Sequence, residues 1–260
     1  MGTFQLIILT LVALGSGTAL ALVWSQKPKF YPALQEYLSK VQQQSLSISP
    51  DRKAALDRLR EYALQREYKG KQTSLLFMCA ENCGRSILTQ VWLEVMARAY
   101  DLPQLLSYSG GTLPAKLDPQ LVQVLEQAGI QVTMAQGTQG EHMQVRLGPK
   151  TRRMNLFAKY FDHVTNPKKN FVAITTDHYT QENLDRVPGA HFKLPMVYDK
   201  PKSAQELEEL SATIAAEMMY LSREIKAAID PLYLHQEGVL RYTKLKPLAR
   251  PALSKQHVAA

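Results

Sequence analysis

The stretch SLLFMCAENCGRS, residues 74–86, decides how the middle of the chain is expected to fold. Residues 74–78 form a short apolar run, which is typical of a buried strand in a parallel sheet. After the stretch, apolar residues recur at helical spacing: Leu88, Val91, Trp92, Val95 and Ala99. A strand that leads through an eight-residue loop into a helix aims backbone N–H groups and the helix N-terminus at one point. The sequence therefore predicts an anion-binding loop at the carboxyl end of this strand.

The side chains of this loop suit the recognition of a tetrahedral oxyanion. The field that favours an anion also stabilises the thiolate of Cys79, which stands at the start of the loop. Arg85 can offer a bidentate guanidinium, and the Ser86 hydroxyl can donate to the thiolate. We expect the substrate to bind against the rest of the loop, which comprises Ala80, Glu81, Asn82, Cys83, Gly84, Arg85 and Ser86. The alternative is a buried structural cysteine followed by an ordinary surface arginine.

These residues resemble the low-molecular-weight protein tyrosine phosphatase superfamily, which includes the thioredoxin-coupled arsenate reductases. The superfamily loop reads Cys-x-x-Asn-x-x-Arg-Ser, and Cys79, Asn82, Arg85 and Ser86 match it in order. Two further segments resemble the superfamily, and the second of them is similar to a bacterial branch with an added N-terminal helical segment. These segments are residues 108–112 and 156–173, and the whole resemblance spans roughly residues 30–228.

The resemblance implies an α/β fold of the flavodoxin-like type, with a four-stranded parallel sheet and helices on both faces. Two further strand candidates support it independently, the buried run at 171–175 and a short edge strand at 193–195. A long helix follows, with Ser203 and Glu206 as a capping box. Folds of this kind bind ligands at the carboxyl ends of their strands, where Cys79 is expected to lie.

The resemblance also implies a second catalytic element, an aspartate beside a proline. Asp199 is the candidate, in the sequence Tyr-Asp-Lys-Pro at 198–201, while Asp162 and Asp177 are its rivals. With Cys79, Arg85 and Asp199 as catalytic residues, the resemblance implies a phosphatase that hydrolyses aryl phosphate monoesters through a thiophosphate intermediate. No cofactor is implied. No metal is expected either, since the six histidines show no metal-ligand spacing with the two cysteines.

Departures from the superfamily pattern keep other functions open. Glu81 stands where many superfamily loops have glycine, so its carboxylate either repels a dianion or points outward, and a positive φ there would be strained. Cys83 either forms a reversible disulfide with Cys79 or is a structural thiol. An arsenate reductase would need cysteines at 176–184, which has none, so Cys83 or an external thiol would have to be its reductant. The third alternative is a non-catalytic phosphate-binding module.

Composition narrows the choice of partners. The chain has 260 residues, 45% of them apolar and 21% charged, which excludes a disordered chain and a polytopic membrane protein. The net charge of +8 suggests an anionic partner. No nucleic-acid-binding motif accompanies it. The resemblance implies a phosphorylated protein, a small phosphate ester or arsenate as the partner. Four basic residues cluster in a region that we expect to form a loop beside the site: Arg146, Lys150, Arg152 and Arg153.

The beginning of the chain resembles a membrane segment. Residues 4–24 are uncharged and apolar, and as a helix they could cross about 30 Å of hydrocarbon. Lysines follow at 27 and 29, so the positive-inside rule predicts an uncleaved anchor with a cytoplasmic catalytic domain. The alternative is a cleaved signal peptide and an exported, periplasmic protein. The expected divisions are an anchor or signal at 1–26, a segment of two packing helices at 27–70, a catalytic domain at 71–230 and a basic tail at 231–260.

Overall fold

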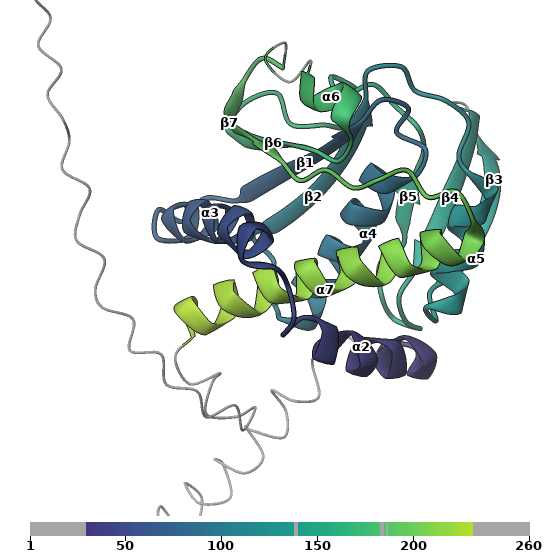
Figure 1. Ribbon diagram of the computed structural model, residues 1–260, viewed down its shortest axis with the longest axis horizontal. Coiled ribbons are helices and arrows are strands. Elements are labelled where there is room, and N and C mark those ends of the chain that lie inside the picture. Colours follow the sequence, from purple (N-terminus) through teal and green to yellow (C-terminus); the bar gives the residue numbers. More distant parts are fainter. Residues whose placement is uncertain (1–29, 138–139, 183–184, 186, 231–260) are drawn as a thin grey trace, which may run out of the picture.

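The centre of the molecule is a four-stranded sheet in which all strands are parallel (Figure 1). The structure is a computed structural model, and it describes residues 30–137, 140–182, 185 and 187–230. The strand order is β2-β1-β6-β7, which confirms the predicted parallel sheet. The strands are β1 (Thr73–Cys79), β2 (Leu105–Gly111), β6 (Phe171–Thr175) and β7 (Ala190–Pro195).

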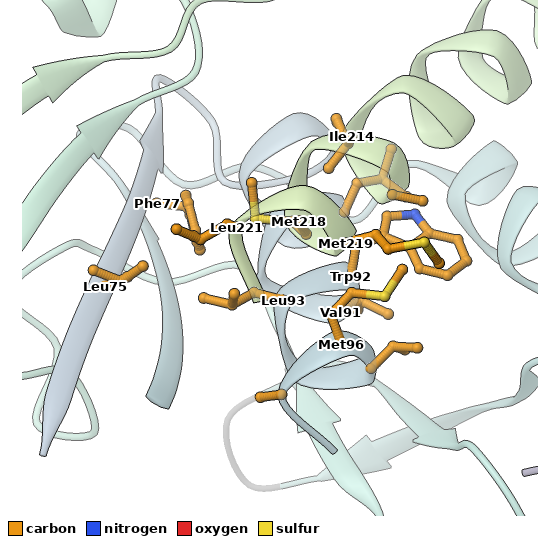
Figure 2. Packing of buried hydrophobic residues seen from close by; sticks show 14 of the residues in the cluster. Leu75, Phe77, Val91, Trp92, Leu93, Met96, Ile214, Met218, Met219 and Leu221 are labelled. Atoms are coloured by element: carbon orange, nitrogen blue, oxygen red, sulfur yellow. The ribbon is translucent and has the colours of Figure 1, made fainter. Parts of the chain in front are cut away.

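One face of the sheet packs against two long helices, α4 (Arg85–Ala99) and α7 (Ala204–Ile229). Figure 2 shows Leu75 and Phe77 of β1 facing the apolar side chains of both helices. The capping residue predicted for α7 is confirmed, because the Ser203 hydroxyl accepts from the backbone N–H of Glu206. This layer contains the largest buried side chains and therefore most of the apolar area whose burial stabilises the fold.

The opposite face of the sheet carries a smaller apolar cluster. Alternate residues of β1, Leu76 and Met78, point to this side, as the period of two in a strand requires. They pack with residues of β6 and with Val187, and Phe161 covers part of the cluster. Both faces of β1 are therefore buried, which explains why its sequence is continuously apolar.

The two predicted helices before the sheet are confirmed as α2 (Pro32–Gln44) and α3 (Pro50–Glu67). Each has proline in its first turn, where the missing N–H has no partner to lose, and the Ser49 hydroxyl caps α3. Leu34, Leu56 and Leu59 are fully buried in the same cluster as the face of β1 that packs on α4. The helical segment and the sheet thus share one core.

A second, antiparallel sheet flanks the loop that the basic cluster predicted. It consists of β3 (Gln131–Gly137), β4 (Gly140–Arg146) and β5 (Met154–Leu156), in the order β3-β4-β5. Arg146 belongs to β4, while the carbonyl of Arg152 accepts from the guanidinium of Arg98. The prediction of a loop holds for Lys150, Arg152 and Arg153, which lie between β4 and β5. It is wrong for Arg146, because Met143 and Val145 bury the inner face of β4. Two shorter helices complete the fold, α5 (Pro119–Gln127) and α6 (His178–Glu182).

The predicted membrane segment at 4–24 and the basic tail at 231–260 lie outside the described residues. Within the described part of the chain, no helix is both long and apolar enough to cross a membrane.

Candidate active site

The loop between β1 and α4 directs its carbonyl oxygens outward. The carbonyls of Ala80, Glu81 and Cys83 accept from backbone N–H groups of the segment after β2, namely Thr112, Leu113, Ala115 and Asp118. A trans peptide is planar, so each carbonyl points opposite to the N–H group of the next residue. The N–H groups of Glu81, Asn82 and Gly84 therefore face the inner side of the loop. Among the described residues, none of these three groups donates to a protein acceptor. Converging N–H groups of this kind form an anion-binding concavity.

Asn82 fixes the shape of the loop. Its side chain is buried, and its φ of 47° lies in the left-handed region, which asparagine adopts more readily than most residues. Its Oδ1 accepts from the backbone N–H of Lys159 at 3.0 Å, and its Nδ2 donates to Ser86 Oγ at 2.9 Å. Because the positive φ is at Asn82 and not at Glu81, the strain considered for a glutamate in this loop does not arise.

Cys79 ends β1 with its sulfur against the start of α4. Its Sγ is buried and lies 2.9 Å from Ser86 Oγ. Since Ser86 Oγ already accepts from Asn82, the hydroxyl proton of Ser86 is available for the sulfur. A hydrogen bond donated to sulfur favours the thiolate, and the N-terminus of α4 adds a favourable field. The geometry therefore suits a nucleophilic cysteine.

The guanidinium of Arg85 is held from two sides. Its Nη1 donates to the carbonyl oxygen of Tyr198 at 2.8 Å, and its Nη2 lies 3.4 Å from Asp177 Oδ2. The same Asp177 oxygen accepts from the backbone N–H of Ala80 at 2.7 Å, while Oδ1 accepts from Thr180 N–H at 2.7 Å. The buried carboxylate of Asp177 thus ties the loop between β1 and α4 to the end of β6 and orients Arg85.

Asp199 occupies a different position from Asp177. Its side chain is exposed and lines a surface hollow of about 370 Å³, which is also lined by Tyr198 and Arg52. No hydrogen bond from the Asp199 carboxylate to the loop is found among the described residues. The structure brings Asp199 near the loop through its neighbour Tyr198, whose carbonyl binds Arg85. The third candidate, Asp162, is exposed.

Cys83 and Glu81 interact with each other at the outer side of the loop. The Cys83 thiol donates to Glu81 Oε2 at 3.4 Å. Burial, followed by the hydrogen bond to Glu81, raises the pKa of Cys83 to about 12. Cys83 is therefore a thiol at neutral pH and a slow nucleophile, since the thiolate is the reactive form.

β2 and the segment after β5 form the wall behind the loop. Gly111 donates its N–H to the carbonyl of Lys159, and a Cβ on this glycine would lie 2.7 Å from the carbonyl oxygen of Ala80. Only glycine allows so close an approach. The Lys159 ammonium lies 5.0 Å from the centre of the Phe157 ring, and burial lowers its pKa to about 8.

Exposed apolar side chains lie on three segments that contact the catalytic loop. Leu113, 61% exposed, donates its N–H to Ala80, and Tyr160, 56% exposed, follows Lys159. Tyr179, 50% exposed, lies two residues after Asp177. These side chains give the surroundings of the loop a partly aromatic character, which suits an aryl group on the ligand.

No family model and no curated protein sequence matches this chain. The chain is similar to several solved structures. A low-molecular-weight protein tyrosine phosphatase from Bacillus subtilis is 11% identical with a TM-score of 0.43, and the match covers 61% of this chain and 99% of that one. A low-molecular-weight phosphotyrosine phosphatase from Vibrio cholerae O395 is 16% identical with a TM-score of 0.40, and the match covers 64% of this chain and 99% of that one. A thioredoxin-dependent arsenate reductase from Corynebacterium glutamicum is 21% identical with a TM-score of 0.37, and the match covers 68% of this chain and 71% of that one.

The sequence identified most of the residues that the structure brings together. Cys79, Asn82 and Ser86 lie in one hydrogen-bonded group. Arg85 is held by partners outside the loop. Asp177 was a rival candidate in the sequence because it follows a strand, and the structure places its carboxylate against Ala80 N–H and Arg85. The wall formed by Gly111 and the segment after β5 has no local motif that could have revealed it.

Proposed function

We propose that this chain is a cysteine-dependent phosphatase of the low-molecular-weight type that hydrolyses aryl phosphate monoesters. The observation that carries the proposal is the inward face of the catalytic loop. There, N–H groups without a protein acceptor among the described residues converge beside the sulfur of Cys79 and the guanidinium of Arg85. This arrangement supplies both the nucleophile and the donors that hold three phosphoryl oxygens. The exposed apolar residues Leu113, Tyr160 and Tyr179 support an aryl leaving group.

In the first chemical step, the Cys79 thiolate attacks phosphorus. An S–P bond forms as the P–O bond to the aryl group breaks, and the loop N–H groups and Arg85 stabilise the charge on the equatorial oxygens. We propose that protonated Asp199 gives its proton to the leaving oxygen, which avoids the release of a poor phenolate leaving group. Asp177 is less suited to this role because its carboxylate already accepts from three N–H donors.

In the second step, water attacks the phosphorus of the thiophosphate. Asp199, now a carboxylate, takes a proton from the water, the S–P bond breaks, and phosphate leaves. The sulfur returns to the thiolate, which the Ser86 hydroxyl stabilises. The loop, Arg85 and one carboxyl group suffice for this sequence, and the proposal includes no cofactor.

Arsenate reduction is the second candidate function. A reductase would form a sulfur–arsenic bond on Cys79, and a second thiol would then attack this sulfur to give a disulfide and release arsenite. That thiol would have to be Cys83 or belong to an external molecule, because the sequence of residues 176–184 includes no cysteine. The pKa of Cys83, raised to about 12 by burial, makes it a poor attacking group.

One comparison separates these functions. Wild type, Cys79→Ser and Asp199→Asn are assayed for phosphate release from p-nitrophenyl phosphate and for arsenate-dependent consumption of an added thiol. The phosphatase proposal expects phosphate release that Cys79→Ser abolishes and that Asp199→Asn lowers by about 10²- to 10⁴-fold. Arsenate-driven thiol consumption with negligible phosphate release would favour the reductase. Phosphate binding without either activity would favour a non-catalytic binding module.

We also propose that residues 4–24 anchor the chain in a membrane with the catalytic domain on the cytoplasmic side. The proposal is supported by the uncharged apolar run and by the lysines that follow it. Alkaline carbonate extraction of membranes and protease protection of sealed vesicles test it. A chain that appears in the periplasm without residues 1–21 would instead be an exported protein with a cleaved signal.

A further inference from the structure

A partly buried arginine of the helical segment contacts the loop that carries Asp199. Arg52, in the first turns of α3, donates from Nη2 to the backbone carbonyl of Val197 at 2.8 Å. Its guanidinium also lies over the ring of Tyr198, 4.6 Å from the ring centre. The helical segment therefore binds the two residues that immediately precede Asp199.

The same arginine forms an ion pair with an acidic residue of α7. Arg52 Nε lies 3.0 Å from Glu217 Oε1, and the two side chains are only 21% and 5% exposed. The other carboxylate oxygen of Glu217 accepts from the hydroxyl of Tyr198 at 2.5 Å. Burial raises the pKa of Glu217, and both Arg52 and the hydrogen bond from Tyr198 oppose that rise.

This network continues to the catalytic loop through one peptide group. The carbonyl oxygen of Tyr198 accepts from Arg85 Nη1 at 2.8 Å. The ring, hydroxyl and preceding carbonyl of this tyrosine are fixed by Arg52 and Glu217. A shift of Tyr198 would therefore move both the acceptor that orients Arg85 and the backbone that places Asp199.

We propose that Arg52 is a positioning residue for catalysis, which makes the N-terminal helical segment a working part of the active site. Arg52 touches neither substrate nor the reacting atoms, and it acts by holding residues 197–199 against Arg85. A guanidinium with several partners is suited to this task because its planar fork binds several acceptors in one fixed geometry. The inference rests on the proposed phosphatase function.

The test compares Arg52→Met with Arg60→Met in the full chain. Arg60 is a matched control because it lies on the same helix, is 19% exposed in its side chain, and pairs with Asp57 outside this network. The values of kcat and KM are measured with phenyl phosphate and with p-nitrophenyl phosphate, whose better leaving group needs less help from an acid. The Kd of inorganic phosphate is measured by calorimetry.

Arg52→Met is expected to lower kcat/KM for phenyl phosphate by about 10- to 100-fold, because small misplacements of catalytic groups have effects of this size. The loss is smaller for p-nitrophenyl phosphate, and phosphate binds several-fold more weakly because Arg85 is less well oriented. Arg60→Met stays within about twofold of wild type, as expected for a residue outside the network. Equal losses for both substrates, with phosphate affinity unchanged, would reduce Arg52 to a structural role and overturn the inference.

Two further results keep the test decisive. If Arg52→Met does not fold, Tyr198→Phe removes only the hydroxyl bonded to Glu217, and it is expected to show a smaller loss with the same dependence on leaving group. No such dependence in Tyr198→Phe would contradict the inference. A wild-type chain that binds phosphate but hydrolyses neither ester contradicts the phosphatase proposal and, with it, the role of Arg52 in catalysis. Weaker phosphate binding by Arg52→Met would then still show that Arg52 orients Arg85. A chain that binds no phosphate contradicts both.

Discussion

At the scale of single residues, Asp177 shows how one carboxylate can organise a loop that precedes it by almost a hundred positions. It accepts from Ala80 N–H and from Arg85 with one oxygen, and from Thr180 N–H with the other. An amide in its place would turn an NH₂ group toward at least one of these donors. The contact is therefore specific to the carboxylate.

Asp177→Asn is expected to lower kcat/KM by about 10- to 100-fold and to weaken inorganic phosphate as an inhibitor, since its NH₂ group would face either Thr180 N–H or the pair formed by Ala80 N–H and Arg85, and the negative charge beside Arg85 is lost in both orientations. Steady-state kinetics with p-nitrophenyl phosphate measure both effects. Asp162→Asn serves as the control because Asp162 is exposed. A loss confined to Asp162→Asn would show that the wrong carboxylate has been placed at the site.

Lys159 makes the stability of the protein depend on pH in the alkaline range. Burial lowers its pKa from the ordinary 10.5 to about 8. Below pH 8 both folded and unfolded states bind the proton, so the cost of burying the ammonium is present in full. Between pH 8 and 10.5 the unfolded state binds more protons, so the free energy of unfolding rises with pH.

We expect Lys159→Met to be more stable than wild type at pH 7, by at most about 3 kcal/mol, with the difference shrinking toward pH 10. Urea unfolding at pH 7 and pH 9.5 measures it. The backbone N–H of residue 159 still donates to Asn82 in the variant, so the loop keeps this contact. A difference that is constant with pH would mean that the lysine is not buried in its charged form.

The residues of the loop could be predicted because they are contiguous in the sequence, from Cys79 to Ser86. The resemblance to the superfamily loop identified Asn82, and the structure adds why asparagine is needed there, since it combines a positive φ with two hydrogen bonds. The sequence offered Asp177 as a candidate but could not name its partners, which lie 97 and 92 positions away. The contact of Arg52 could not be predicted, because its partner lies 145 positions away.

At the scale of secondary-structure elements, the close approach of β2 to the catalytic loop is the constraint that sets the site. A Cβ at Gly111 would lie 2.7 Å from the carbonyl oxygen of Ala80 and 3.0 Å from the backbone nitrogen of Asn82. Both neighbours are backbone atoms, which cannot turn away as a side chain can. The end of β2 therefore acts as a rigid support for the loop.

Gly111→Ala is expected to displace the loop, lowering kcat/KM by at least about tenfold and the free energy of unfolding by about 1–3 kcal/mol. Gly137→Ala is the control, since its Cβ would meet the ring of His142 at 3.1 Å and a side chain can move. Kinetics and urea unfolding of both variants test the expectation. Full activity in Gly111→Ala would show that the loop tolerates the added methyl group.

Elements with strong local signals were predicted well, and elements defined by partners were not. The run at 171–175 is β6, and the helix with Ser203 before it is α7. The second sheet was missed because β3 is mostly exposed and carries no strict alternation of apolar residues. Its existence depends on pairing with β4, which is a long-range property of the folded chain.

At the scale of the whole molecule, the helical segment completes the core instead of standing apart from it. Leu34, Val41, Leu56 and Leu59 belong to the same apolar cluster as β1, α4 and α7. The spacing of these residues in the sequence predicts apolar helix faces, but spacing alone cannot name the surface that a face will cover. The structure shows that α2 and α3 both pack on α7.

A chain that begins at residue 71 is therefore expected to lack a cooperative unfolding transition, because it exposes the surface that α2 and α3 cover. Circular dichroism during heating tests this, with a chain that begins at residue 30 as the control. Leu56→Ala in the full chain is a milder version and is expected to cost about 2–5 kcal/mol. A sharp transition in the shorter chain, with a Tm near that of the control, would show that the sheet and its helices are sufficient alone.

The contact between the helical segment and α4 also gives the protein an optical signal. Trp92 is fully buried, its ring stacks on Tyr37 with centres 5.2 Å apart, and its Nε1 donates to Ser211 at 2.9 Å. The sequence has one other tryptophan, Trp24, so a chain that begins at residue 30 emits from Trp92 alone. Excitation energy absorbed by Tyr37 can then transfer to this indole. The apolar surroundings of the indole shift its emission to the blue. Undocking of α2 would shift the emission of Trp92 to the red and end the energy transfer from Tyr37. Fluorescence can therefore follow the helical segment without any added label.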